Sequence, residues 1–459
     1  MSMLIRAGVV VPAIGGTVVE NGAVVVEHGR ITEVLDARAA EAAVTAFAGE
    51  AIDEPQSVLM PGLVNIHTHG VSPSPLFPSG SAALADERWR ANLDRHLHAG
   101  TTTVLSTCGL GSMEEIRYAD ANHAVHVRAA TAHTPGAIDA ARAADGAGLT
   151  ARHRVLTIEA MLDAGAVAIG ELGGGQTLGG GGQDLVYLPA AIRERTGGVV
   201  TQAQARALKE AVLGRFMSER RYRPEVLAAA AEEAAITGIT TEELRELIVA
   251  TVMPSVGHAR DGIREGIEAA RILGVPALVH SASASADLIR SLQMQRDPRP
   301  ATIIAGHVNH TSHTVEEAVA LAELGRESGW HAEASVFDLL EGRETVQTRE
   351  HWDALMARPG LVDVIATDYG HDGRHDSLIA AVRDLVDAGH RTLAEAVEMV
   401  TSAPAALIPG LVRGGAMLRA GAPADLLLTR RDDLRQVQRV IVGGETVVRD
   451  GAGALAGSA

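Results

Sequence analysis

Residues 59–70 read Leu-Met-Pro-Gly-Leu-Val-Asn-Ile-His-Thr-His-Gly, a short apolar run that ends in the pair His67 and His69. Because alternate residues of a strand point to the same face, both imidazoles would project together from the end of this strand. Two imidazoles held side by side on a strand form a chelate for a divalent metal. Two polar residues that merely end a strand are the simpler alternative, but the Pro-Gly before the run and the Gly after it favour a metal site.

Four more apolar runs further along the chain end in a residue that could bind a metal: Glu171, His280, His307 and Asp368. A single buried histidine is usually a hydrogen-bonded core residue and indicates little by itself.

The middle of the chain alternates strand-like runs with helical patterns, which is typical of an α/β fold with parallel strands. Eight runs fit a (β/α)8 TIM barrel over residues 59–411, and a doubly wound sheet is the alternative. The last four metal-binding candidates end strands, where the active sites of barrels lie. The expected strands are 63–69, 102–107, 127–133, 166–171, 277–280, 302–307, 330–335 and 362–368.

Both ends of the chain read as short strands separated by turns. They predict a small composite β-sandwich built from residues 1–58 and 412–459. The expected strands are 4–11, 23–27 and 30–35 at one end, and 425–429, 437–442 and 446–449 at the other.

One spacing departs from a simple barrel, because 109 residues separate Glu171 from His280, whereas a barrel unit has about 30. The excess begins with seven glycines in residues 173–182. Helical patterns follow over 201–216, over 224–236 and from 240 to about 252, and together they predict a helical insertion at about 183–255. The insertion could be a packing layer or a subunit contact, or it could be a lid over the site.

The sequence of residues 59–70 resembles that of the amidohydrolase superfamily, whose first barrel strand ends in the pattern PG-x-x-(D/N)-x-H-x-H. The closing phrase Gly-Ala-Pro-Ala-Asp-Leu at 421–426 is similar to that of members with a composite sandwich. The resemblance implies two divalent metal ions, zinc or else iron or manganese. The superfamily carries further ligands after its fourth, fifth, sixth and eighth strands, and Glu171, His280, His307 and Asp368 follow in that order. Six matches are hard to explain as core residues, so we expect a metal centre. The resemblance places His67, His69 and Asp368 on the more buried metal, His280 and His307 on the more exposed one, and Glu171 between them.

The resemblance also implies a reaction, in which a hydroxide that bridges the metals attacks a carbonyl and Asp368 shuttles the proton to the leaving group. Many relatives bridge their metals with a carbamylated lysine. The only lysine here, Lys209, lies in the insertion, so the bridge is expected to be a carboxylate or to be absent. Glu171 stands where the family places its bridging residue, and the resemblance implies that its carboxylate is the bridge.

Mononuclear deaminases of the same superfamily are the competing enzyme class. They usually place a glutamate three residues after the histidine of the fifth strand, where this chain has Ser283. This departure favours hydrolysis of a C–N bond in an amide, a lactam or a cyclic enamide, and the pattern is most similar to the enamidase-like branch. Isoaspartyl dipeptidase-like and dihydroorotase-like activities stay open. A non-catalytic scaffold relative would lack ligands, and none is missing.

Substrate contacts are expected from His133, at the end of the third strand, and from His310, just after His307. The segment after the last ligand adds further candidates that would face the same site, namely Tyr369, His371, Arg374 and His375.

The composition limits the partners. A formal charge of −17 argues against nucleic acid and anionic membrane surfaces. Cys108 is the only cysteine, so no intramolecular disulfide can form. The chain shows neither a signal-peptide pattern nor an apolar run long enough to span a membrane. We expect a cytoplasmic homo-oligomer that acts on a small molecule.

Overall fold

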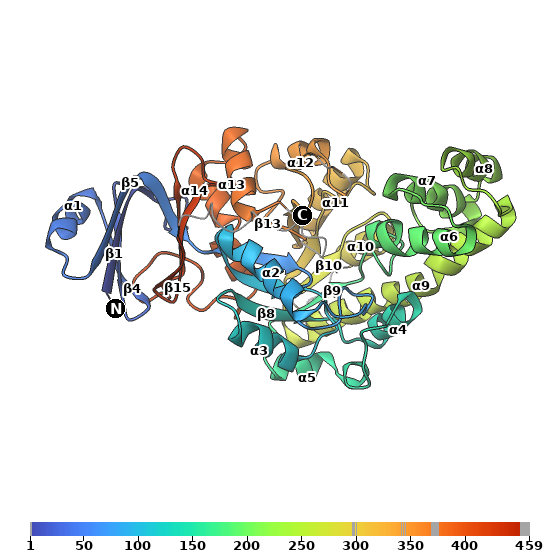
Figure 1. Ribbon diagram of the computed structural model, residues 1–459, viewed down its shortest axis with the longest axis horizontal. Helices are drawn as coiled ribbons and strands as arrows, with labels where there is room; N and C mark the ends of the chain where they lie inside the picture. Colours follow the sequence, from blue (N-terminus) through green and yellow to red (C-terminus); the bar gives the residue numbers. More distant parts are fainter. Residues whose placement is uncertain are drawn as a thin grey trace.

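The computed structural model describes residues 2–295, 299, 301–340, 342, 344, 346–368 and 376–449. Its centre is a sheet of eight parallel strands in sequential order, from β6 through to β13. Helices surround it, as Figure 1 shows, and the predicted (β/α)8 barrel is confirmed. The strands are β6 (Leu63–Thr68), β7 (Thr101–Ser106), β8 (His126–Thr131), β9 (Ala168–Leu172), β10 (Ala277–His280), β11 (Ile303–Gly306), β12 (His331–Ser335) and β13 (Val364–Ala366).

The first and last barrel strands meet through a polar contact rather than through a regular ladder. The Asp368 N–H donates to the His67 carbonyl at 3.1 Å. Below it, the Asn65 amide donates to the Thr367 hydroxyl at 2.7 Å and accepts from the Thr367 N–H at 3.2 Å. This contact holds the residues after β6 and β13 beside each other.

The barrel strands are buried along nearly their whole length, and residues of β6, β7, β9, β10 and β13 are all buried. Parallel strands covered on both faces read as nearly continuous apolar runs, which explains why the sequence reveals them. Trp89 and Trp352, on two surrounding helices, are fully buried in the same core.

The helices of the barrel follow their strands in chain order. Several begin with a capping box, for example Ser112 with Glu115 and Thr314 with Glu317. The helices are α2 (Asp86–His98), α3 (Met113–Ala121), α4 (Pro135–Ala144), η1 (His153–Val155), α5 (Ile158–Asp163), α9 (Thr241–Leu273), α10 (Ala286–Met294), α11 (Val315–Glu327), α12 (Arg349–Met356), α13 (Leu378–Asp387), α14 (Leu393–Glu398) and α15 (Ser402–Leu407).

The two ends of the chain build a second, separate sheet, as expected, and it lies at one end of the molecule (Figure 1). Its strand order is β16-β15-β14-β5-β1-β3-β4, with β2 paired to β1, and β14 joins the C-terminal strands to β5. The elements are β1 (Ser2–Val10), β2 (Val19–Glu20), β3 (Ala23–Glu27), β4 (Arg30–Leu35), α1 (Ala37–Ala46), β5 (Glu50–Pro61), β14 (Leu426–Arg430), β15 (Val437–Val442) and β16 (Glu445–Arg449).

The long segment after β9 forms a helical lobe at the other end of the molecule (Figure 1). It contains η2 (Gln183–Tyr187), α6 (Leu188–Thr196), α7 (Gln202–Leu213), η3 (Glu219–Arg221), α8 (Pro224–Glu233) and the first half of α9. The helix expected to stop near residue 252 instead continues through Pro254 to Leu273. A proline costs this helix one hydrogen bond, but Val252, Val256 and Ile263 are buried on either side of it and hold the helix together.

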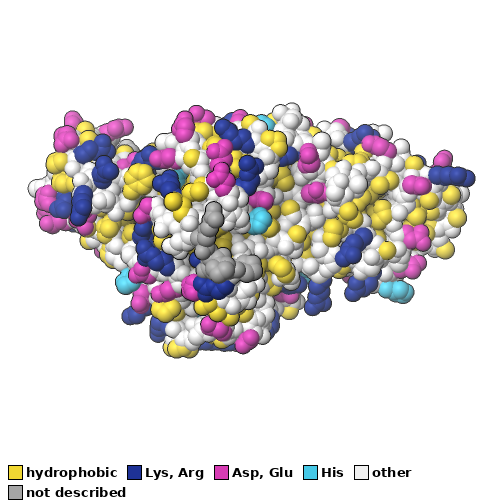
Figure 2. Space-filling view, turned by 180° about the vertical axis from the view of Figure 1, so that it is seen from behind, with side chains coloured by type: hydrophobic (Ala, Val, Ile, Leu, Met, Phe, Trp, Pro, Cys, Tyr) yellow, Lys and Arg dark blue, Asp and Glu magenta, His cyan; other side chains and the backbone are white. Residues whose placement is uncertain are grey.

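Acidic and basic side chains are interspersed over the face of the molecule shown in Figure 2. That face therefore carries no broad field of a single sign. None of the helices in the described part of the chain is long and apolar enough to cross a membrane.

Candidate metal centre

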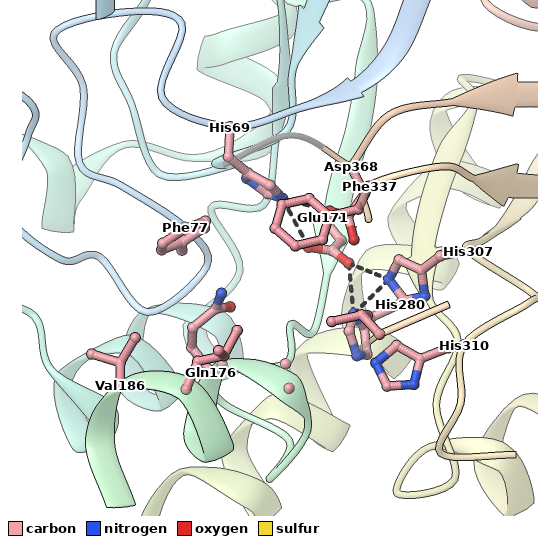
Figure 3. Close-up of a pocket in the computed structure, with 15 residues that line it drawn as sticks. His69, Phe77, Glu171, Gln176, Val186, His280, His307, His310, Phe337 and Asp368 are labelled. Carbon is pink, nitrogen blue, oxygen red and sulfur yellow. Dashed lines mark hydrogen bonds and ion pairs between the residues drawn. The ribbon is translucent and has the colours of Figure 1, made fainter. Parts of the chain in front are cut away.

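All six residues expected to bind metal converge at one end of the barrel (Figure 3 shows five of them). The four histidines and Glu171 are at most 4% exposed, and the Asp368 side chain is 20% exposed. They come from or directly follow the strands β6, β9, β10, β11 and β13. These are the carboxyl ends of the strands, where barrel active sites lie.

Glu171 is the centre of the cluster. Its Oε1 lies 2.7 Å from His280 Nδ1 and 3.2 Å from His307 Nε2. Its Oε2 faces the other way and lies 3.7 Å from His69 Nε2. One carboxylate therefore contacts histidines on both sides, as a bridge between two cations would.

Asp368 closes the other side of the cluster. Its Oδ1 lies 3.5 Å from the Nε2 atoms of both His67 and His69. These separations exceed hydrogen-bond length and leave room between the three groups. Asp368 also adopts a left-handed backbone conformation, with φ of 50°, which is uncommon for a non-glycine residue and often occurs at functional sites.

The charges of the cluster fit a bound cation. Burial lowers the pKa of His69, but the interactions with Asp368, Cys108 and Glu171 together outweigh burial and raise the pKa to about 9. Burial alone would raise the pKa of Glu171, yet His280 and His307 hold it well below its usual value. Two buried carboxylates thus draw positive charge into the cluster, as protons on the imidazoles or as metal ions in their place.

A nitrogen without a hydrogen-bond partner is a second indication that the cluster fits a metal ion. His67 Nε2 is buried and has no hydrogen-bond partner among the described residues, although it lies within 3.7 Å of a Glu171 oxygen. Two sets of ligand atoms lie close enough to share an ion: His67, His69 and Asp368, and His67, Glu171 and His307. Imidazole nitrogens and carboxylate oxygens are ligands for zinc, iron and manganese.

Glu333 on β12 is a functional residue that the sequence analysis missed. It is completely buried, and its Oε2 accepts from His67 Nδ1 and from the His307 N–H, both at 2.9 Å. A carboxylate on the far nitrogen of a metal-binding histidine fixes the tautomer and makes the ring a better ligand. The signal in the sequence is a charged residue inside an apolar strand, which requires a buried partner.

Cys108 was likewise not assigned to the site. It is buried, and its Sγ lies 3.6 Å from His69 Nδ1. The sulfur therefore contacts the nitrogen of His69 that faces away from Asp368, and helps to orient that ring.

A cavity of about 260 Å³ opens over the cluster. The glycine-rich segment 173–182 forms part of its wall, and Leu185 and Val186 at the start of the insertion continue this wall (Figure 3). This wall passes within van der Waals distance of the histidines. A Cβ on Gly180 would lie 3.7 Å from His280 Nε2, and one on Gly181 would lie 3.8 Å from His310 Nε2.

The two residues expected to contact substrate lie in different places. His310 lines the cavity beside His280 and His307 (Figure 3). Burial, His307 and His280 hold its pKa well below the usual value, so the ring is neutral.

His133 does not line the cavity, and the geometry gives no support to its expected role. It is buried, with its Nδ1 2.9 Å from the Thr131 hydroxyl. Burial and the nearby His153 lower its pKa to about 4. The candidates Tyr369, His371, Arg374 and His375 lie outside the described residues.

Ser283, at the position of the deaminase glutamate, has a structural contact. Its hydroxyl donates to the Arg215 carbonyl at 2.7 Å, and its N–H donates to the Ser312 hydroxyl at 2.9 Å. The position therefore ties the helical lobe to the barrel loops after β10 and β11.

A model of the amidohydrolase family matches residues 58–447. The chain therefore belongs to the amidohydrolase family, whose members are generally metal-dependent hydrolases. No curated protein matches the chain.

Solved structures with the same fold include three hydrolases of low identity. The chain is similar to a β-aspartyl dipeptidase from Fervidobacterium islandicum AW-1 in complex with a β-Asp-Leu dipeptide, at 14% identity and a TM-score of 0.54, with 98% of this chain and 97% of that chain covered. It is similar to the A. niger ochratoxinase at 16% identity and a TM-score of 0.53, with 98% and 97% covered. It is also similar to a molinate hydrolase at 16% identity and a TM-score of 0.52, with 100% and 96% covered.

Proposed function

We propose that the protein hydrolyses a C–N bond of an amide, a lactam or a cyclic enamide with two divalent metal ions, most simply zinc, with iron or manganese as the alternatives. The observation that carries this proposal is the position of Glu171, which contacts His280 and His307 through one oxygen and faces His69 with the other. The residues that hold the first metal would be His67, His69 and Asp368, and those that hold the second would be His280 and His307.

The metals, when bound, would polarise the substrate carbonyl and lower the pKa of a bridging water so that it attacks at neutral pH. Asp368 is the proton carrier in this reaction, because its one-fifth exposed carboxylate borders the cavity beside the ligands. It accepts the proton of the attacking water and passes it to the leaving nitrogen. Glu333 holds the ring of His67 in place during the reaction.

The substrate class has indirect support. The sequence pattern around the ligands is similar to that of the enamidase-like branch, and Ser283 occupies the place of a deaminase glutamate. Two of the similar structures bear the names of a dipeptidase, bound to its dipeptide, and of a molinate hydrolase.

The decisive experiment combines metal analysis with one variant. Protein purified without chelator should contain close to two equivalents of metal per chain and should hydrolyse members of a panel of lactams, cyclic imides and N-acyl amides. Its activity should not depend on bicarbonate, because no lysine stands at the bridge. Asp368→Asn should lower kcat by at least about a hundredfold, a typical contribution of general acid–base catalysis, whereas the exposed control Asp261→Asn should match the wild type.

Full activity with a single equivalent of metal would favour the mononuclear alternative. Restoration of a lost activity by bicarbonate would disprove the carboxylate bridge. Deamination of a ring substrate without any amide hydrolysis would disprove the proposed reaction.

A further inference from the structure

We propose that the cavity selects an uncharged substrate with an apolar substituent, and that Gln176 is the polar side chain that binds it. This inference rests on the proposed function, because it concerns the substrate of the same site. Gln176 lies on the glycine-rich segment, opposite the metal ligands, and its amide points into the space between Phe77 and Glu171 (Figure 3).

The first observation is the chemistry of the wall. Apart from the expected metal ligands, no side chain among the described residues that line the cavity is an aspartate, glutamate, lysine or arginine. The apolar wall consists of Phe77, Leu185, Val186, Phe337 and Val346. A substrate carboxylate that lay away from the metal ligands, against this apolar wall, would be desolvated without a cation among the described side chains to pair with, and this is unfavourable.

The second observation is that the side chain of Gln176 is held in place. A Cβ on Gly182 would come within 2.5 Å of Gln176 Cγ, and a Cβ on Gly174 within 3.0 Å of Gln176 Oε1. Gly182 therefore needs to be glycine for this side chain to fit, and Gly174 leaves room for its amide oxygen. The segment that contains them thus presents one particular amide to the cavity.

The third observation is an unmet hydrogen bond. Gln176 Oε1 is buried and accepts no hydrogen bond from any described residue. A buried acceptor without a partner is unfavourable, and rotation of the amide about its soft terminal torsion would turn the oxygen toward the cavity, where a ligand N–H would satisfy it. Because the terminal torsion of glutamine is soft, the same amide can also donate to a ligand carbonyl. An amide or a lactam offers both groups.

The test is a binding measurement on the zinc-loaded enzyme with two compounds that contain no carboxamide: N-hexylbenzenesulfonamide and its 4-carboxylate. Both offer an N–H, oxygen acceptors and an apolar chain, and they differ in charge. By calorimetry the neutral compound should bind the wild type at least about tenfold more tightly. Gln176→Leu should weaken its binding by about tenfold, as the loss of one hydrogen bond would, without loss of metal.

Two further variants test the role of Gln176: one introduces a positive charge at this position, and the other is a matched control on the surface. Gln176→Arg should reverse the preference in favour of the carboxylate, because it places a cation in the cavity. Gln56→Leu, the same change at an exposed position on β5, should behave as the wild type. Tighter binding of the carboxylate by the wild type, or unchanged affinities in Gln176→Leu, would overturn the inference.

Hydrolysis is measured separately, with hexanoyl anilide and its 4-carboxylate as substrates. If binding follows the expected order but no amide in the panel is cleaved, the cavity assignment stands and the proposed reaction fails. If the enzyme cleaves amides but prefers the charged anilide, the proposed reaction stands and the assignment of Gln176 fails.

Discussion

The hydrogen bond between Glu333 and His67 Nδ1 decides which nitrogen of that ring faces the other ligands. Glu333→Gln keeps the shape of the side chain but removes its negative charge, and the ring becomes a weaker ligand. We expect a fall of about 10–100-fold in metal affinity. Competition with a chromogenic chelator measures this change. The surface control Glu323→Gln should leave the affinity unchanged, and an unaltered affinity in Glu333→Gln would show that His67 needs no such partner.

The protonation of His69 predicts a pH dependence of the metal-free protein. Its pKa is about 9 in the fold and about 6.5 in an unfolded chain. The stabilisation from its proton is therefore complete below pH 6.5 and is lost as the pH rises through 9. A metal requires the unprotonated ring, so its stabilisation grows over the same range.

The measurable consequence is a difference in melting temperature between zinc-loaded and chelator-treated protein that widens from pH 6.5 to pH 9. Differential scanning fluorimetry at a series of pH values checks it. Replacement of the exposed histidine on α9, His258→Gln, should leave the trend intact. A difference that stayed constant or narrowed with pH would contradict the charge state assigned to His69.

At the residue scale, site residues could be predicted from the sequence where they end a strand or an apolar run. His67 and His69 share a strand end, and His280 ends an apolar run. Glu333 shows in the sequence only that it needs a buried partner, because that partner, His67, lies far away in the chain. Gln176 carries no pattern, because its role depends on the position of a loop. His133 has the right position in the chain but does not line the cavity, because its side chain contacts Thr131.

At the scale of elements, the position of the glycine-rich segment depends on α7. Lys209, the only lysine, is 3% exposed and donates to the Gly179 carbonyl. It also pairs with the buried Asp184 at 2.5 Å, and Arg206 contacts the same carboxylate at 3.2 Å. Lys209 thus joins α7 to the second half of the glycine-rich segment and to η2, which follows directly after it.

Lys209→Met should leave Asp184 with Arg206 as its remaining partner and should release the Gly179 carbonyl. We expect a loss of about 2 kcal/mol in stability, less than for a fully broken buried pair, and a higher KM with unchanged metal content. Denaturant unfolding and steady-state kinetics measure the two effects. The matched control Arg195→Met removes an exposed cation from an ion pair with Glu243 and should change little. A lower metal content in Lys209→Met would place this ion pair in the metal site itself.

Two elements show why their bounds could not be predicted from sequence. β5 contains Pro55, which normally argues against a central strand. The strand accommodates it beside a register shift in β1, where a Cβ on Gly8 would lie 2.1 Å from the Pro55 carbonyl oxygen. In α9, likewise, packing on both sides of Pro254 overrides the local signal. In both cases a tertiary contact outweighs the preference of a single residue.

At the scale of the whole molecule, the helical lobe stands apart from the composite sheet, with the barrel between them (Figure 1). None of the six expected metal ligands lies in the lobe. It reaches the site through Leu185 and Val186 in the cavity wall, and through Arg215, whose carbonyl binds Ser283. These contacts favour a role in shaping the cavity, and a contact between subunits of a homo-oligomer is the alternative.

A deletion of residues 199–239 would distinguish a role of the lobe in shaping the cavity from a role as a subunit contact. The gap can be closed by a short linker, because Arg195 at the end of α6 contacts Glu243 at the start of α9 at 3.1 Å. Leu244 and Ile248, which are buried in the intact protein, are changed to Gln in the same variant. We expect two equivalents of metal to remain, because the ligands are untouched. We also expect a higher KM and weaker discrimination between neutral and charged substrates, because Lys209 and Arg215 no longer hold the cavity wall.

Three measurements on this variant distinguish the alternatives: metal analysis, steady-state kinetics, and light scattering after size-exclusion chromatography. The intact protein with only the Leu244 and Ile248 changes controls for the effect of the helix surface. Loss of metal from a folded deletion variant would show that the lobe is needed to assemble the barrel site. Unchanged kinetics with a smaller oligomer would make the lobe a subunit contact. A higher KM with two metals and an unchanged oligomeric state is the result that the contacts of Lys209 and Arg215 predict, because those contacts fix the cavity wall and supply no metal ligand.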